Sequence, residues 1–274
     1  MDVRRRMQRL RSALAPEPST TSFDFDDYAA SEIASDGFPV VPPPLRHSSA
    51  PDFESWLAGG REHFESMLAI LRQHALPETP GTRILDYGCS SGRTVRNWGR
   101  HEWAEVWGCE IDFDRTQWCR RNLGHVRQTA HGENRFRFVQ TRERPPLPFE
   151  DGMFDLIYAG SVFTHISHYI DQWLLELRRV LRPGGQFFVT IHDETTWRIV
   201  REQGSAIIGG VVDRAGGEAK ELPQDFLTVG KDAASQVFFR SDYFRALVEP
   251  FFEIQAFVPE ARGYQSAFLL KKPC

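Results

Sequence analysis

The chain of 274 residues is 41% hydrophobic and 12% aromatic, a composition that suits one large α/β domain with a substantial core. Its formal net charge of -4 provides no overall positive field for nucleic acid, so we expect no nucleic-acid partner. No segment approaches the roughly 18 uninterrupted apolar residues that span a bilayer, so we expect no membrane span.

The cysteines show neither a metal-binding nor a disulfide pattern. They lie at Cys89, Cys109, Cys119 and Cys274 without a C-x-x-C pair, and no apolar secretory leader precedes them. Reduced thiols are therefore expected, together with a cytoplasmic location and no metal site.

Residues 1–50 differ in composition from the rest of the chain and are predicted to be a partly disordered extension ahead of a domain at 51–274. Arginines dominate residues 1–15, whereas acids dominate residues 16–36, so the two runs have opposite charge. Residues 38–44 are rich in proline and are expected to be extended.

Apolar residues recur at helical spacing from Phe53 until Pro77 and Pro80 end the pattern. This spacing predicts a helix whose apolar face packs against a sheet. The helix would therefore lie immediately ahead of the first strand of that sheet.

Residues 83–93 predict a strand, a tight turn and the start of a helix at 94–98. Asp86 closes the apolar strand, and Gly88 and Gly92 bracket the small residues of the turn. Glycines allow positive φ and let a ligand approach the backbone amides at a helix N-terminus. The G-x-x-x-G spacing matches neither the dinucleotide fingerprint nor a phosphate loop, and an acid here favours a positively charged ligand with hydroxyls. The alternative is a purely structural turn.

A second strand is predicted at 105–110, and it ends in Glu110, 24 residues after Asp86. A carboxylate at this point of a βαβ unit can accept hydrogen bonds from both hydroxyls of a ribose. The alternative for Glu110 is a surface acid. Because an acid at a strand end is not part of the core, its removal is expected to change fold stability little. A third strand, at 135–139, leads into Thr141.

These residues resemble motif I and the following strands of the class I S-adenosylmethionine-dependent methyltransferases, with Ser90 at the position of the middle glycine. The resemblance implies S-adenosylmethionine as the cofactor. The cofactor-binding residues that it implies are Asp86, Gly88, Cys89, Ser90, Gly92, Glu110, Ile111, Thr141 and Ser161. Many members hold the adenine with an acid where this chain has Thr141, so the main chain is expected to make that contact. Cys89 is expected to be a small packing residue, not a nucleophile.

A second signature covers residues 146–195. A turn at 146–152 precedes a buried strand at 153–159, and a following helix is expected to stop at Arg182-Pro183-Gly184-Gly185 before a strand at 186–191. This order resembles the same methyltransferase class more specifically than motif I alone. The segment Ser-Val-Phe-Thr-His at 161–165 resembles that of a bacterial subgroup associated with glycan biosynthesis.

The C-terminal part predicts a helix at 242–248 and two strands, 251–258 and 265–270, that form an antiparallel hairpin. The polar, glycine-bearing insert at about 195–236 is either a mobile cover or an ordinary surface excursion. The predicted fold is α/β and Rossmann-like, with a seven-stranded, doubly wound, mostly parallel sheet and a closing antiparallel hairpin.

Ligands of an open parallel sheet bind beyond the C-terminal ends of the strands. The fourth and fifth strands deliver His165, His192 and Asp193 to that edge. An acceptor hydroxyl must lose a proton, and histidine titrates near working pH, so either histidine is a candidate base. Asp193 would orient a histidine or bind the acceptor. The other histidines are expected at the surface: His101, His125, His131 and His168.

The predicted function is methyl transfer from S-adenosylmethionine to a hydroxyl of a small molecule or glycan. Two alternatives stay open: N-methylation of a small amine, and a catalytically silent partner protein that only binds the cofactor. Methylation of a nucleic-acid base is disfavoured because Ala-Gly-Ser-Val-Phe at 159–163 lacks a polar and aromatic clamp for a flipped base. The sequence makes no prediction of oligomeric state.

Overall fold

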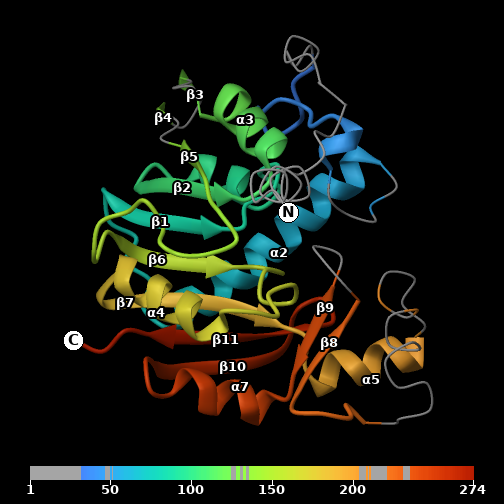
Figure 1. Cartoon of the computed structure of the whole chain (residues 1–274). Coiled ribbons are helices and arrows are strands. Elements are labelled where there is room, and N and C mark those ends of the chain that lie inside the picture. The colour runs from blue at the N-terminus through green and yellow to red at the C-terminus, as the bar shows by residue number, and fades with distance from the viewer. Residues whose placement is uncertain are drawn as a thin grey trace, which may run out of the picture.

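The computed structural model describes residues 32–46, 50, 52–124, 128–129, 132–133, 136–203, 208, 210, 221–230 and 235–274. Among them, seven strands form one sheet in the order β10-β11-β7-β6-β1-β2-β5 (Figure 1). The strands are β1 Thr82–Tyr87, β2 Ala104–Glu110, β5 Phe136–Gln140, β6 Phe154–Ala159, β7 Leu181–Ile191, β10 Glu253–Arg262 and β11 Gln265–Lys271.

Pairing within this sheet is parallel from β7 through β6, β1 and β2 to β5. Strand β11 runs antiparallel to both β7 and β10. These pairings confirm the predicted fold: a seven-stranded, mostly parallel sheet with a closing antiparallel hairpin. The switch in strand order lies between β1 and β6, where a parallel α/β sheet opens at its C-terminal edge.

Five α-helices and two short 3-10 helices have described bounds. They are α2 Phe53–Gln73, α3 Phe113–Asn122, α4 Ile170–Val180, α5 Glu194–Gln203, α7 Ser241–Val248, η2 Pro43–Leu45 and η3 Val95–Arg100. Two small hairpins accompany them: β3 Gln128–Thr129 with β4 Gly132–Glu133, and β8 Phe226–Val229 with β9 Gln236–Phe239. In the described part of the chain, no helix is long and apolar enough to cross a bilayer.

Alternating side chains of the strands supply two cores, one on each face of the sheet. Ile84 joins the cluster that contains Leu68 of α2, whereas its neighbour Leu85 joins the cluster that contains Leu174 of α4. Helices α2 and α3 therefore cover one face, and α4 and α7 cover the other (Figure 1). The connection 141–153 contains no helix.

Three local predictions differ from the structure. The helix after the glycine turn is the 3-10 helix η3, in which the Asn97 amide donates to the Thr94 carbonyl oxygen at 3.1 Å. The expected stop at 182–185 lies inside β7, where the Gly184 amide donates to the Lys272 carbonyl oxygen at 2.8 Å. Strand β10 continues to Arg262, beyond the predicted end at 258, because the hairpin pairs Arg262 with Gln265.

Part of the region predicted as an extension packs into the domain. Phe38 and Val41 are buried in the α2-side core, and Asp36 forms a buried ion pair with Arg96 of η3 at 2.5 Å. Residues 38–44 are therefore not simply an extended link, since Pro43–Leu45 is η2. Residues 1–31 lie outside the described residues.

His101, expected at the surface, is half-buried among the rings of Phe64, Trp98 and Trp103. Its neighbours in that cluster lie on α2, on η3 and ahead of β2. The aromatic surroundings explain the burial, because an imidazole ring packs against other rings much as a small aromatic side chain does.

The described parts of the predicted cover insert form a third, smaller cluster. Trp197 and Val200 of α5 pack with Phe238 of β9, Ile208, Leu222 and Val229. A parallel bridge between His192 and Phe238 joins this cluster to the end of β7. Residues 204–207, 209, 211–220 and 231–234 of the insert lie outside the described residues.

Candidate functional site

The glycine turn after β1 needs a left-handed backbone at three positions. Gly88 has a φ of 81° and Gly92 a φ of 86°, and a Cβ at these positions would lie 2.5 Å from Val162 and 2.4 Å from Leu123. Ser90, at the position of the middle glycine, also has a positive φ of 49°. The turn therefore packs directly on the segment after β6 and on the C-cap of α3.

Glu110, the last residue of β2, is only 7% exposed, and its carboxylate is bound to backbone amides. Its Oε2 accepts from the Ser90 amide at 2.7 Å, while Oε1 accepts from the amides of Ile111 and Asp112 at 2.8 and 2.9 Å. The surface-acid alternative is therefore wrong, because the side chain fastens the glycine turn to β2. A carboxylate has about four acceptor positions, so capacity remains for a ligand hydroxyl.

Asp86 lies near the end of β1, is 3% exposed, and leaves its Oδ2 without a hydrogen-bond partner among the described residues. The Tyr158 hydroxyl donates to this carboxylate and accepts from Trp98 Nε1 at 3.2 Å. Burial raises the pKa of Asp86 to about 7, against the opposing effects of the Tyr158 hydrogen bond and the charge of Arg262. A buried carboxylate with an unpartnered oxygen fits a cationic group of a ligand.

The remaining residues that the resemblance assigns to the cofactor differ in exposure. Cys89 is buried, and a hydrogen bond with the Cys119 thiol, together with burial, raises its pKa. A raised pKa disfavours the thiolate, so the arrangement suits a packing residue. Ile111 is exposed, and Thr141 is half-buried with its amide donating to the Glu110 carbonyl oxygen at 2.8 Å.

A polar network joins the end of β6 to β7 and β11. Ser161 Oγ and Thr190 Oγ1 both donate to Gln265 Oε1, at 2.9 and 2.7 Å. The Ser161 amide donates to Thr190 Oγ1 at 2.8 Å. The two hydroxyls identify Oε1 as the oxygen of the Gln265 amide. The amide nitrogen therefore lies 3.3 Å from His192 Nε2 and donates to it.

His165 has the surroundings of a neutral base. Its Nδ1 lies 2.8 Å from the Ser235 carbonyl oxygen, which can only accept, so Nδ1 carries the proton and Nε2 keeps a lone pair. The residue is half-buried, and burial lowers its pKa from 6.5, with the Ser235 contact opposing the shift. The imidazole is therefore uncharged at neutral pH.

His192 is enclosed instead. It is 1% exposed, its ring packs against those of Phe238 and Tyr264, and its Nε2 accepts from Gln265. Burial lowers its pKa to about 3, and its buried Nδ1 has no partner among the described residues. The lone pair that a base would use is already engaged.

Asp193 caps helix α5. It is 0% exposed, and its Oδ1 accepts from the Thr196 amide at 3.0 Å. An aspartate in this position satisfies one of the free amides of the first helical turn. The side chain thus holds α5, while its other carboxylate oxygen, Oδ2, is buried without a partner among the described residues, so the two roles expected for it stay predictions.

Sequence reasoning missed four residues at this end of the sheet: His63 of α2, Arg93 after the glycine turn, Arg262 of β10, and Gln265 of β11. Only Arg93 had a positional signal, because it directly follows Gly92. Arg262 and Gln265 lay within or beside the predicted hairpin connection, where nothing in the sequence indicated a contact with Gly160 or Ser161.

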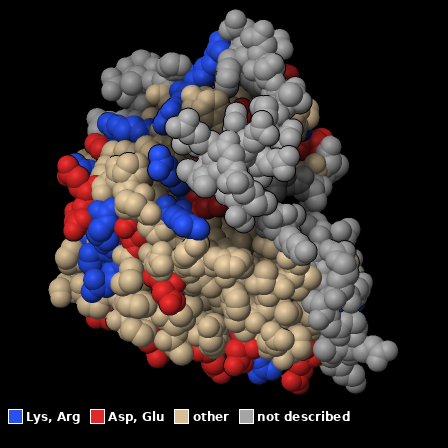
Figure 2. Space-filling model, in the orientation of Figure 1, with Lys and Arg blue, Asp and Glu red and all other residues tan. Residues whose placement is uncertain are grey.

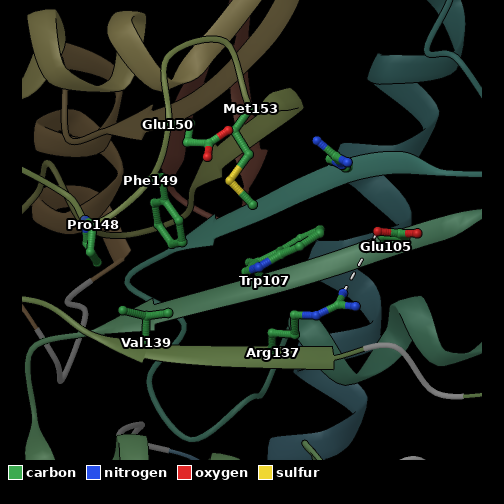
Figure 3. A pocket seen from close by; sticks show the side chains of 9 residues that line it. Glu105, Trp107, Arg137, Val139, Pro148, Phe149, Glu150 and Met153 are labelled. Carbon is green, nitrogen blue, oxygen red and sulfur yellow. Dashed lines mark ion pairs between the residues drawn. The ribbon is translucent and has the colours of Figure 1, made fainter.

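A cavity of about 560 Å³ lies elsewhere, between β1, β2 and β5 and the helix-free connection 141–153 (Figure 3). Figure 3 shows Arg137 extended between Trp107 and Glu105, with its guanidinium 4.7 Å from the Trp107 ring centroid and 3.9 Å from the Glu105 carboxylate. Its lining includes Arg83, near the start of β1. Because it lies away from the strand C-termini, this cavity is not the predicted site.

The visible surface on this side of the molecule has no single sign of charge. Figure 2 shows basic and acidic side chains side by side in the upper left of the view, above a broad uncharged area. Among the described residues that this view shows, acidic side chains therefore interrupt the basic ones.

Residues 85–189 match the family model of the methyltransferase domain. The chain is 25% identical over 166 residues to a malonyl-[acyl-carrier protein] O-methyltransferase of Geobacter sulfurreducens, a match that spans 60% of this chain and 58% of that protein. It is 30% identical over 112 residues to a ubiquinone/menaquinone biosynthesis C-methyltransferase of Laribacter hongkongensis, across 40% of this chain and 43% of that protein.

Among solved structures, the fold resembles the 1,6-didemethyltoxoflavin-N1-methyltransferase of Burkholderia thailandensis with bound S-adenosylhomocysteine. The TM-score is 0.51 at 17% identity, and the match covers 86% of this chain and 95% of that one. The matches span about three fifths and two fifths of the length of these two curated relatives. The names of these three proteins specify oxygen, carbon and nitrogen as the methylated atom, so the comparisons do not identify a single acceptor atom.

Proposed function

We propose that this protein, whose residues 85–189 match the methyltransferase-domain family model, transfers a methyl group from S-adenosylmethionine to an oxygen atom of a small-molecule or glycan acceptor. The observation that carries the proposal is that two groups lie at the same end of the sheet. One is the buried carboxylate of Asp86, whose Oδ2 has no partner among the described residues, and the other is the neutral imidazole of His165. One group suits a cationic cofactor, and the other suits a protic acceptor.

The cofactor would be held by residues that follow β1 and β2. Asp86 Oδ2 fits the positively charged end of S-adenosylmethionine, Gly88 and Gly92 leave room for close backbone approach, and Glu110 has capacity for a ribose hydroxyl. When bound, S-adenosylmethionine supplies an already activated methyl group. The protein's work is then to orient the acceptor and to keep water away.

His165 is the proposed base. Its Nε2 lone pair can take the proton of an acceptor hydroxyl, and the Ser235 carbonyl oxygen holds the ring in the tautomer that leaves Nε2 deprotonated. The same contact stabilises the imidazolium, because Nδ1 remains a donor after Nε2 is protonated. His192 and Asp193 are better assigned to support, through the Gln265 network and the cap of α5.

Methylation of a small amine remains the second candidate, since a protonated amine also needs a base and a structural relative is named as an N-methyltransferase. A catalytically silent cofactor-binding protein is the third. Product analysis separates all three, because O-methyl, N-methyl and absent products differ chemically. The resemblance to a subgroup associated with glycan biosynthesis supports only the proposed class of acceptor, a glycan hydroxyl.

The test is transfer of radiolabelled methyl from S-adenosylmethionine to a panel of sugars, other small hydroxyl compounds and small amines, with products identified by mass. We expect an O-methylated product, and His165→Ala should lose it. His168→Ala is the matched control, because His168 is exposed, lies three residues away, and bonds only to Ser167 among the described residues. Cofactor binding without transfer to any acceptor would favour the silent partner.

A further inference from the structure

A cluster of basic side chains lies beside Asp86 and has no place in the transfer step described above. Arg262 ends β10, Arg93 follows the glycine turn, and His63 lies on α2. Burial lowers the pKa of His63 to about 3, and the charges of Arg262 and Arg93 act in the same direction, so both guanidiniums lie close enough to affect its charge. Nδ1 of His63 is buried without a partner among the described residues.

Arg262 lies across the end of β6. A Cβ added to Gly160, the residue after β6, would lie 1.7 Å from Nη1 of Arg262, so the absence of a side chain there makes room for the guanidinium. The end of β10 is held against α2, because Ser66 Oγ donates to the Ala261 carbonyl oxygen at 2.6 Å. The guanidinium therefore lies beside Gly160, the residue before Ser161, and close enough to Asp86 for the two charges to affect each other.

The guanidinium of Arg262 makes no hydrogen bond or ion pair with any described residue. Burial lowers its pKa to about 10, and the charge of Arg93 acts in the same direction, whereas Asp86 opposes the shift without pairing with it. Arg93 has one polar contact, from Nε to the Trp56 carbonyl oxygen at 3.1 Å. Partly buried guanidiniums without an acceptor are costly unless a ligand supplies one.

The charges do not balance within the protein at this point. The charges of Arg93 and Asp86 both act on Arg262, and Asp86 is the group that the cationic cofactor uses under the proposed function. Glu62, the acid nearest Arg93, is exposed, and Glu110 is bound by three amides. S-adenosylmethionine carries a carboxylate, an ammonium and a sulfonium, so its binding would add one net positive charge. An anion on the other substrate would balance this excess.

We propose that Arg262, with Arg93 beside it, binds an oxyanion carried by the methyl acceptor, so that the acceptor is a carboxylate- or phosphate-bearing compound. This inference rests on the proposed function. The planar guanidinium offers paired donors that match either oxyanion. Its place over Gly160, next to Ser161, puts the anion on the β6 side of the site, away from the ribose acid at the end of β2.

The first arm of the test distinguishes an anion on the acceptor from the carboxylate of the cofactor. Calorimetry measures S-adenosylhomocysteine and 5′-methylthioadenosine, which lacks the amino-acid end, on the full chain and on Arg262→Ala. We expect both affinities to be unchanged by the substitution. A loss confined to S-adenosylhomocysteine would overturn the proposal, because the anion would then be the cofactor's own carboxylate.

The second arm titrates S-adenosylhomocysteine-loaded protein with succinate, with inorganic phosphate, and with uncharged succinamide. We expect one of the two anions to bind, succinamide not to bind, and Arg262→Ala to weaken the anion at least about tenfold. Preference between the anions then distinguishes carboxylate from phosphate acceptors. Equal anion binding by the wild type and Arg262→Ala, or none to either, would refute the subsite.

Two further variants keep the test decisive. Gly160→Ala displaces the guanidinium without removing its charge, and it should also weaken the anion. Arg198→Ala is the control, since Arg198 is an exposed arginine paired with Glu202 and Glu260, and it should bind like the wild type. If the wild type bound neither nucleoside but bound the anion through Arg262, the proposed function would fail while the oxyanion subsite stood.

Discussion

The cofactor side and the acceptor side of this site are built from different parts of the chain. Asp86, the glycine turn and Glu110 fall within one βαβ unit, and Glu110 is bonded to the turn only 20 residues away. On the acceptor side, His165 is held by Ser235 across 70 residues, and Ser161 by Gln265 across 104. The comparison teaches that cofactor recognition is local here, whereas acceptor recognition depends on the complete tertiary fold.

The largest effect is expected on the acceptor side, in the rate. His165→Ala should lower kcat about 10²–10⁴-fold, because the neutral Nε2 that takes the acceptor proton is lost. S-adenosylhomocysteine affinity should stay near the wild-type value, since His165 lies outside the β1–β2 turn. Steady-state kinetics on a confirmed acceptor give kcat, and unchanged kcat would mean that transfer proceeds by positioning alone.

On the cofactor side, Glu110→Ala should weaken S-adenosylhomocysteine by roughly 1–3 kcal/mol through the loss of a charged acceptor for the ribose. The three backbone amides that it binds would also lose their acceptor, so the free energy of unfolding should fall by a similar amount. Calorimetry and urea denaturation measure the two effects.

Glu105→Ala is the matched control for that variant. Glu105 lies on the same strand and lines the distant cavity of Figure 3. Cofactor affinity should not change in this variant. If Glu105→Ala weakened the cofactor and Glu110→Ala did not, the cavity of Figure 3 would be the cofactor site.

The pH dependence of cofactor binding should sharpen the same comparison. Burial raises the pKa of Asp86 to about 7, so as pH falls through this value the free carboxyl gains a proton and loses its attraction for a cation. Affinity should therefore fall below pH 7, by at most about tenfold per pH unit. Asp86→Asn should bind more weakly and show a flat profile over the same range. A wild-type profile as flat as that of the variant would remove Asp86 from the cofactor contact.

The smallest effect is expected at Asp193. Asp193→Ala should lower the free energy of unfolding by about 0.5–2 kcal/mol, the usual cost of losing a helix N-cap, with kcat nearly unchanged. Thermal unfolding and kinetics together check this. A large fall in kcat at unchanged stability would return Asp193 to the catalytic residues.

The same contrast between local and long-range contacts explains which parts of the site could be predicted from the sequence. The positions of Asp86 and Glu110 at the ends of two strands follow from apolar periodicity and glycine spacing, which act over a few residues. The seven-stranded sheet is implied by the resemblance to the methyltransferase class. The enclosure of His192 by Phe238 and Tyr264 does not, because it depends on the insert folding back over β7. Arg262 was missed for the same reason, since its contact with Gly160 joins residues 102 apart.

The most direct test of this division is a single calorimetric series, in which S-adenosylhomocysteine is titrated into the wild type, Glu110→Ala and His165→Ala under one set of conditions. We expect micromolar binding to the wild type, the same affinity for His165→Ala, and a loss of roughly 1–3 kcal/mol for Glu110→Ala. Equal losses of affinity in both variants, or no binding to the wild type, would contradict the claim that the residues of the β1–β2 unit bind the cofactor without help from the acceptor side.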